Sequence, residues 1–175
     1  MGSTRQKTIF ISGPVRSGKS RLAVELAKKS GKRVVFLATA QALDPQMRRR
    51  IKAHKKERPA AWHTIEEPVA VAAVIKKRLA GELVILDCIT LWLSNMLLAG
   101  LGLAVINARI KKFVETIKTC RAAVIIVSNE VGWGIVPENK LARDFRDIAG
   151  TAHQKIAAVA DEVYLCASGI PIRIK

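Results

Sequence analysis

A glycine-rich loop near the N-terminus constrains the fold of this chain more than any other feature of the sequence. The loop follows the apolar, strand-like segment Thr8–Ser12 and precedes Lys19–Lys29, which has the periodicity of a helix. Gly13 and the triplet Gly18-Lys19-Ser20 complete the pattern G-x-x-x-x-G-K-S. Glycines let the backbone curl so that successive N–H groups point at phosphate oxygens, and the helix N-terminus adds a favourable dipole. The sequence therefore predicts a phosphate-binding loop.

Lys19 and Ser20 are the side chains of this loop that carry chemistry. We expect the Lys19 ammonium at the β- and γ-phosphates of a nucleoside triphosphate and the Ser20 hydroxyl at its magnesium ion. Such a site also needs a carboxylate, and Asp87 ends the apolar segment Leu83–Asp87. An acid at the carboxyl end of a buried strand lies at the rim where open α/β sheets bind ligands. We therefore predict Ser20 and Asp87 as magnesium ligands, with a helix or turn cap as the alternative role of Asp87.

Apolar segments rich in Val and Ile alternate with helical stretches along the chain. Their nearly continuous apolar character is typical of strands buried on both faces, as in a parallel sheet covered by helices. The predicted strands are Thr8–Ser12, Arg33–Ala38, Leu83–Asp87, Ala123–Ser128 and Glu162–Ala167, with Ile170–Ile174 as a short antiparallel edge strand. The predicted helices are Lys19–Lys29, Pro45–Glu57 capped by Asp44, Pro68–Ala80, Ala108–Cys120 and Asn139–Ala160. We therefore expect one doubly wound α/β domain over residues 1–175.

The formal net charge of the 175-residue chain is +16. Such a charge suits nucleic acid, but it suits small polyanions such as nucleotides equally well. Only 5% of the residues are aromatic, and no basic segment carries interleaved aromatic residues for stacking bases. Charge alone therefore does not decide the partner.

Compartment is indicated by the cysteines and by the absence of a targeting signal. No apolar run approaches the ~20 residues of a membrane span, and Met1–Lys7 has no apolar signal-peptide core. Cys88, Cys120 and Cys166 are far apart and lack the spacing of zinc ligands. We predict buried free thiols and a cytoplasmic protein without a membrane span.

A cluster of basic side chains crowds one short predicted helix and its end, opposed only by Glu57. These are Arg48, Arg49, Arg50, Lys52, Lys55, Lys56 and Arg58. A charge run is usually a solvated face, but repulsion between residues four apart costs helix stability, and bound phosphate would offset that cost. His54 lies inside this run, and a neutral imidazole is a competent nucleophile toward phosphorus. The residues alone leave His54 either catalytic or structural, and we assign His63 and His153 structural roles.

Three parts of the sequence together resemble one enzyme family. They are the loop Gly13–Arg21 with Ala38-Thr39-Ala40, the block Arg50–Trp62 with its pattern H-x-x-x-R-P, and the stretch Ser128–Asn139 with N-E-V-G-x-G-I-V-P-E-N, followed by Phe145–Gly150. The family is the bifunctional adenosylcobinamide kinase / adenosylcobinamide-phosphate guanylyltransferase of cobalamin biosynthesis. The resemblance spans nearly the whole chain, and the second and third parts are far more specific than the phosphate loop.

The resemblance implies two reactions. A kinase step moves the γ-phosphate of ATP or GTP to the aminopropanol hydroxyl of adenosylcobinamide. A second step transfers GMP from GTP to adenosylcobinamide phosphate, giving adenosyl-GDP-cobinamide and pyrophosphate, and passes through a guanylylated histidine that corresponds to His54. The resemblance further implies a RecA-like P-loop fold, Mg²⁺ with ATP and GTP as substrates, and a homotrimer. From the low aromatic content and the lack of a nucleic-acid motif we expect no nucleic-acid partner.

The resemblance also implies which residues bind the nucleotide, with Lys19 and His54 as the catalytic residues. The implied contacts are Gly13, Pro14, Val15, Arg16, Ser17, Gly18, Lys19, Ser20, Ala38, Thr39, Ala40, Lys55, Lys56, Glu57, Arg58, Glu66 and Asp87. The chain departs from the family at two of the quoted positions. Pro14 replaces a common glycine, and Ala53 replaces a histidine that often precedes the nucleophile.

Two other functions stay open at this point. A P-loop kinase that acts on a small molecule without nucleotidyl transfer would make His54 dispensable. A RecA-like ATPase that binds nucleic acid would use the +16 charge and would bind DNA tightly, with a steep dependence on salt. The low aromatic content and the lack of a nucleic-acid motif count against the second function.

Overall fold

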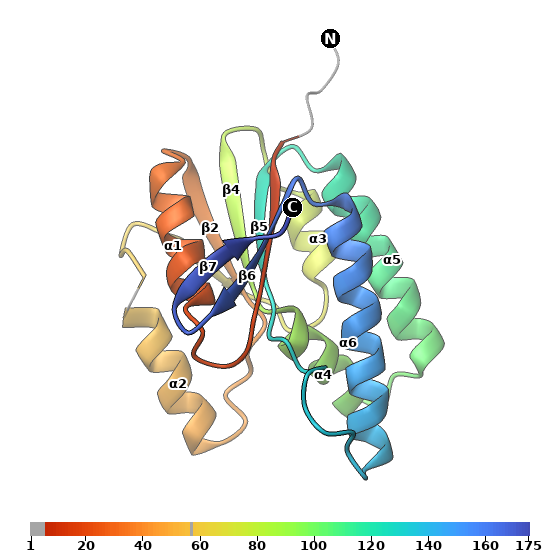
Figure 1. The fold of residues 1–175 in the computed structure, drawn as a ribbon. Coiled ribbons are helices and arrows are strands. Elements are labelled where there is room, and N and C mark those ends of the chain that lie inside the picture. The colour runs from red at the N-terminus through yellow and green to blue at the C-terminus, as the bar shows by residue number, and fades with distance from the viewer. Residues whose placement is uncertain (1–5, 57) are drawn as a thin grey trace.

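The fold is built on one twisted sheet, seen in a computed structural model that describes residues 6–56 and 58–175 (Figure 1). The strands are β1 (Thr8–Ser12), β2 (Arg33–Ala38), β3 (His63–Glu66), β4 (Glu82–Asp87), β5 (Ala123–Val127), β6 (Glu162–Ala167) and β7 (Ile170–Arg173). Their order in the seven-stranded sheet is β3-β2-β4-β5-β1-β6-β7. All neighbours are parallel except β6 and β7. The predicted mostly parallel sheet with an antiparallel C-terminal edge strand is confirmed.

Helices cover both faces of this sheet (Figure 1). They are α1 (Lys19–Lys29), α2 (Pro45–Lys56), α3 (Val71–Lys76), α4 (Ile89–Leu98), α5 (Leu103–Thr119) and α6 (Lys140–Val159). On one face, Ala23 and Ala27 of α1 pack against the sheet. On the other face, α3 to α6 enclose a larger core that contains Trp92 and Phe113. The α2 helix has no buried residue and stands apart from both cores.

The side chains of the central strands alternate between these two cores. In β4, Val84 and Leu86 belong to the core under α3 to α6, whereas Leu83 and Ile85 belong to the core under α1. Successive side chains of a strand point to opposite faces, so a strand covered on both sides must be apolar at every position. This is the physical reason why the Val- and Ile-rich segments predicted the strands correctly.

Two elements were not predicted. The short strand β3 is polar, with the sequence His-Thr-Ile-Glu, and it pairs only with β2 at the edge of the sheet. The α4 helix follows β4 after a single residue and is apolar on nearly every side, so it lacks the periodic pattern of a surface helix. In addition, α3 is shorter than the predicted Pro68–Ala80, and α5 begins at Leu103 and not at Ala108.

Two further expectations concern the cysteines and the membrane. Cys88, Cys120 and Cys166 are all buried free thiols, as predicted. Among the helices of the described residues, none combines the length and the apolar character that crossing a membrane requires.

Candidate active site

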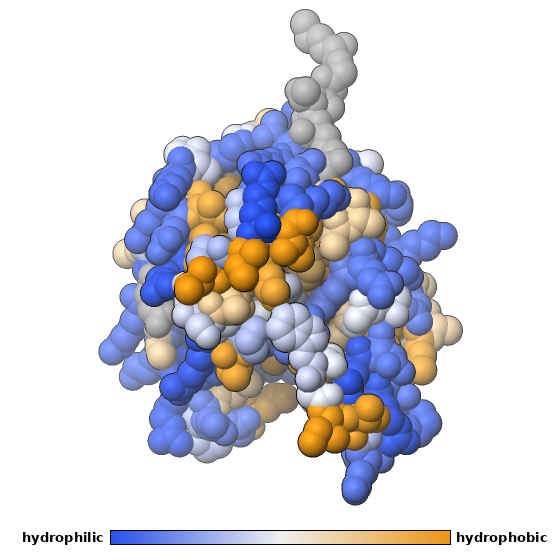
Figure 2. All heavy atoms as spheres, viewed as in Figure 1, coloured by the Kyte–Doolittle hydropathy of each residue, from blue (hydrophilic) through white to orange (hydrophobic). Residues whose placement is uncertain are grey.

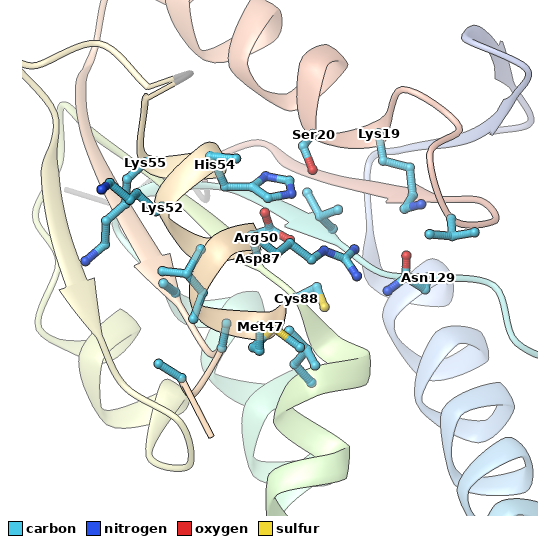
Figure 3. A pocket seen from close by; sticks show the side chains of 18 of the residues that line it. Lys19, Ser20, Met47, Arg50, Lys52, His54, Lys55, Asp87, Cys88 and Asn129 are labelled. Carbon is cyan, nitrogen blue, oxygen red and sulfur yellow. The ribbon is translucent and has the colours of Figure 1, made fainter. Parts of the chain in front are cut away.

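The register of the parallel strands brings four residues into one row at the carboxyl edge of the sheet. Ala38 of β2 lies opposite both Glu66 of β3 and Asp87 of β4, and Asp87 lies opposite Val127 of β5. All four residues line a cavity of about 1390 Å³. The phosphate loop and α2 form its other walls (Figure 3). This volume exceeds the roughly 300–1,000 Å³ of an ordinary small-molecule site, so a nucleotide leaves room for a second substrate.

The phosphate loop requires glycine at two positions. Gly13 has a φ of +149°, and a Cβ atom there would lie 2.3 Å from the carbonyl oxygen of Cys166. Gly18 has a φ of +93° and is the N-cap of α1, so the loop turns directly into the helix. Residues 15–20 line the cavity, whereas Gly13 and Pro14, two of the predicted nucleotide contacts, do not. The predicted strand, loop and helix are therefore all present.

Lys19 lies in this loop with its side chain buried. Its ammonium donates to the carbonyl oxygen of Pro14 and lies 3.3 Å from Ser17 Oγ. Burial lowers the pKa of Lys19, while negative charge at Cys88 and Asp87 opposes this shift. A cation held by its own loop is already close to the position that β- and γ-phosphates take in such loops.

Ser20 and Asp87 supply the oxygen atoms that a magnesium ion would need. Both residues line the cavity, Ser20 from the start of α1 and Asp87 from the end of β4 (Figure 3). Mg²⁺ is commonly held by one or two protein oxygens together with phosphates and water. The described residues contain no group of three or more His, Cys, Asp or Glu that could hold a metal by themselves. The donor set therefore fits a magnesium ion that arrives with a nucleotide.

The environment of Asp87 explains how it would respond to substitution. Burial raises the pKa of Asp87, and the neighbouring His54, Arg58 and Lys19 oppose this rise. We predict that Asp87→Asn reduces magnesium-dependent nucleotide turnover by about 10- to 100-fold, because an amide is a weaker ligand than a carboxylate. The same change should alter the free energy of unfolding by less than about 1 kcal/mol, since it keeps the shape and removes a buried charge. Turnover over a range of Mg²⁺ concentrations, with urea unfolding as the control, checks this; an unchanged magnesium dependence would make Asp87 a structural residue.

Thr39 occupies a different place from its neighbours Ala38 and Ala40, which line the cavity. Its buried hydroxyl accepts from the N–H of Cys88 at 2.9 Å and donates to the carbonyl oxygen of the same residue at 2.8 Å. The amide of Asn95 on α4 donates to the Thr39 carbonyl at 2.8 Å. These bonds fix the end of β4, and with it the backbone of Asp87.

The α2 helix presents one face to the cavity. It begins at Pro45, and the carboxylate of Asp44 caps it by accepting from the N–H of Met47 at 2.7 Å. Nine residues of α2 line the cavity, and among them Met47, Arg50, Ile51 and His54 have the spacing of three and four residues that defines one helix face. The His54 imidazole projects from α2 toward the phosphate loop (Figure 3). Nucleophile candidate and phosphate loop thus face each other across the cavity.

The remaining predicted nucleotide contacts divide into three groups. Lys55, Arg58 and Glu66 line the cavity, where Lys55 forms an ion pair with Glu66. The Arg58 guanidinium lies over the ring of Phe36, with its central carbon 3.5 Å from the ring centroid. Lys56 is exposed and does not line the cavity, and Glu57 lies outside the described residues.

Several cavity residues were not predicted as site residues, among them Met47, Cys88 and Asn129, and Arg50 was predicted only as a member of the basic cluster. Arg50 and Met47 precede His54 by four and seven residues, so helical periodicity places them on the same face as His54. Asn129 follows β5 at the carboxyl edge of the sheet, and its amide donates to the Thr90 hydroxyl at 3.1 Å. Its place just after a central strand is the sequence signal that could have identified it.

His153 is part of a buried polar network next to the cavity. Its Nε2 lies 2.7 Å from the Ser128 hydroxyl, and its Nδ1 lies 3.7 Å from a carboxylate oxygen of Glu130. Burial lowers the pKa of His153, and Glu130 opposes the shift. The N–H of Glu130 donates to the Gly13 carbonyl at 2.8 Å. The network therefore fastens the segment after β5 to the start of the phosphate loop.

Comparisons with known proteins agree with this arrangement. A family model described as "Cobinamide kinase / cobinamide phosphate guanyltransferase" (CobU) matches residues 9–174. The bifunctional adenosylcobalamin biosynthesis protein CobP of Pseudomonas aeruginosa is 43% identical over 167 residues, which cover 95% of this chain and 96% of that protein. The corresponding protein CobU of Escherichia coli is 41% identical over 180 residues, with coverage of 95% and 99%.

Similarity to a solved structure supports the fold but not the activity. The RadB recombinase superimposes with a TM-score of 0.51 at 17% sequence identity, over 91% of this chain and 73% of that chain. At this identity the likeness establishes a RecA-like P-loop fold and nothing about activity. The family model and the relatives go further, because they match nearly the whole length at high identity. The chain therefore belongs to the cobinamide kinase / cobinamide phosphate guanyltransferase family.

Proposed function

We propose that this chain phosphorylates adenosylcobinamide with ATP or GTP and then transfers GMP from GTP to adenosylcobinamide phosphate through His54. One observation carries the proposal: Lys19 of the phosphate loop and His54 of α2 line the same cavity from opposite walls. A kinase without nucleotidyl transfer would need the loop but no histidine on the facing helix. The basic side chains of α2 that line this cavity suit anionic small molecules, so we expect no nucleic-acid partner.

The kinase step makes modest demands on the residues of this site. The backbone N–H groups of the loop and the Lys19 ammonium hold the β- and γ-phosphates in place. Mg²⁺ held by Ser20 and Asp87 would neutralise charge on the phosphate oxygens. The remaining requirement is that the acceptor hydroxyl meets the γ-phosphorus in line, and this requires no covalent residue.

GMP transfer makes a different demand, because both partners are strongly anionic. A covalent relay through His54 divides the transfer into two steps. The neutral imidazole first attacks GTP, and adenosylcobinamide phosphate then attacks the resulting phosphoramidate. Basic residues of the cavity wall, such as Lys55 and Arg58, would reduce repulsion when adenosylcobinamide phosphate arrives. Both reactions can therefore share one nucleotide site.

The proposed function is tested by incubating the purified protein with adenosylcobinamide, GTP and Mg²⁺ and separating the corrinoid products. We expect adenosylcobinamide phosphate first and adenosyl-GDP-cobinamide with pyrophosphate afterwards. Formation of the phosphate alone would leave a kinase without nucleotidyl transfer. Formation of neither product would contradict the proposal.

We further propose that the chain assembles as a homotrimer. The motivation is the family, and two exposed apolar surfaces support it (Figure 2). One consists of Ile170, Ile172 and Ile174 in and after β7, and the other of Trp133, Ile135 and Val136 before α6. Neighbouring apolar side chains that are exposed together commonly mark surfaces of contact between protein chains. Light scattering at micromolar concentration should give three times the mass of one chain, and a monomer would exclude the trimer.

A further inference from the structure

We propose that Arg50 is a further catalytic residue, whose guanidinium binds the α-phosphate of GTP and stabilises its negative charge while GMP moves to His54. This inference rests on the proposed function and assigns Arg50 to one of its two reactions. The evidence is the position of Arg50 on α2, the absence of a hydrogen-bond or ion-pair partner among residues 6–56 and 58–175, and the chemistry of the guanidinium.

Arg50 lies one helical turn before His54. Four residues of an α-helix turn through about 400°, so the two side chains point in directions only about 40° apart, with their Cβ atoms about 5–6 Å from each other. Both line the cavity, and the Arg50 side chain extends beside Asp87 toward Asn129 and Lys19 (Figure 3). A phosphate within reach of the His54 imidazole is therefore also within reach of Arg50.

The neighbouring residue Arg49 provides a comparison within the same helix. Both arginines are exposed, but only Arg50 lines the cavity, because one residue turns the direction of a side chain by about 100°. Of these two adjacent arginines, only Arg50 is placed to meet a nucleotide. A general need for positive charge on α2 would not distinguish them.

Among the residues that the structure describes, Arg50 faces the carboxylate of Asp87 but forms no ion pair with it. Lys55, on the same helix, is paired with Glu66, whereas Arg50 makes no hydrogen bond or ion pair within residues 6–56 and 58–175. Burial determines the direction of the pKa shifts of Asp87 and Lys19, and the charge of Arg50 acts to lower the pKa of both. Arg50 thus adds to the positive charge of Lys19 and Arg58 around Asp87, which an anionic ligand would reduce further.

The α-phosphate is the group that fits this position. The N–H groups of the loop and Lys19 take the β- and γ-phosphates, which leaves the α-phosphate for the wall formed by α2. An unprotonated ring nitrogen of His54 attacks the α-phosphorus and forms the P–N bond with its lone pair. The P–O bond to the β-phosphate breaks, and its electron pair leaves on pyrophosphate. Arg50 gains and loses no proton in this step.

The second half of the reaction uses the same contact. A phosphate oxygen of adenosylcobinamide phosphate attacks the phosphorus, the P–N bond breaks, and its electron pair returns to the imidazole. In both halves negative charge builds up on the oxygens of one phosphorus. A guanidinium presents its N–H donors to two oxygens at once and stays charged, which suits it to this task.

The test compares Arg50→Ala and Arg50→Lys with the matched control Arg49→Ala. The measured quantity is the rate at which α-labelled GTP labels the protein in a single turnover, with Mg²⁺ and saturating GTP. We expect Arg50→Ala to slow labelling by about 100- to 1,000-fold, the range for loss of one transition-state donor. Arg50→Lys should recover part of the rate, since it restores the positive charge but not the planar group of N–H donors that binds two oxygens at once. Arg49→Ala should label like the wild type.

The possible outcomes separate this inference from the proposed function. Wild-type protein that takes no label would overturn the proposed function, and this inference with it. Label on the wild type that forms equally fast on Arg50→Ala, with helix content unchanged by circular dichroism, would overturn this inference alone. An equal loss in Arg49→Ala would also overturn it, because the effect would then come from the overall charge of α2.

Discussion

Lys19→Ala is expected to slow cobinamide phosphorylation and GMP transfer together, each by at least about 100-fold. Both reactions need a triphosphate whose β- and γ-phosphates are held in one orientation, and we expect Lys19, the buried cation of the loop, to hold them. Leaving-group charge also develops near this lysine in both steps, on the nucleoside diphosphate in one and on pyrophosphate in the other. Separate assays of the two corrinoid products check the prediction.

A second lysine on the same helix provides the control for Lys19. Lys28 is exposed near the end of α1 and does not line the cavity, so Lys28→Ala removes the same charge outside the site. It should keep both rates. Burial disfavours the charged form of Lys19, so its removal should not unfold the protein, and circular dichroism tests this. Near-native rates in Lys19→Ala would mean that the loop does not bind the triphosphate.

His54→Ala is expected to abolish GMP transfer while cobinamide phosphorylation stays within about 10-fold of the wild-type rate. Phosphoryl transfer to an alcohol needs an aligned donor, acceptor and metal, and none of these requires an imidazole. GMP transfer loses its covalent relay and has to bring two anions into direct contact. The two activities should therefore separate in one variant, which no loss of fold could produce.

The structure of α2 makes this variant easy to interpret. The helix buries none of its residues, and alanine is the better helix former, so His54→Ala should cost little stability. His63 is exposed and lies outside the cavity lining, which makes His63→Ala the matched control. If His54→Ala still formed adenosyl-GDP-cobinamide at the wild-type rate, His54 could not be the nucleophile. If a well-folded variant lost both activities, His54 would mainly position the nucleotide.

The sheet was predictable from sequence wherever burial on both faces left an unbroken apolar run, as in β1, β4 and β5. The phosphate loop was predictable for a related reason, since Gly13 and Gly18 adopt backbone angles that favour glycine. Where burial did not determine the pattern, prediction failed. The polar edge strand β3 gave no apolar signal, and the apolar helix α4 gave no periodic signal.

In the candidate site, too, some residues could be predicted from local sequence, whereas others depend on contacts between distant parts of the chain. The places of Lys19, Ser20 and Asp87 at the cavity could be predicted from a helix start and a strand end. Glu66 came only from the family resemblance, because its contact with the cavity depends on the register of β2 with β3. The role of Thr39 in fixing the end of β4 required the three-dimensional contact with Cys88, 49 residues away. Contacts between residues so far apart in the chain cannot be predicted from the spacing of residues within one element.

The covalent passage of GMP through His54 can be observed directly on the protein. Purified protein is incubated with α-labelled GTP and Mg²⁺, and the label that stays bound after denaturation is exposed to acid and to alkali. A guanylylated His54 predicts label that is lost in acid, stable in alkali, located by peptide mapping at His54, and transferred to added adenosylcobinamide phosphate as adenosyl-GDP-cobinamide. A protein that forms adenosyl-GDP-cobinamide without ever carrying such a label, or that carries it on a residue other than His54, would contradict this mechanism.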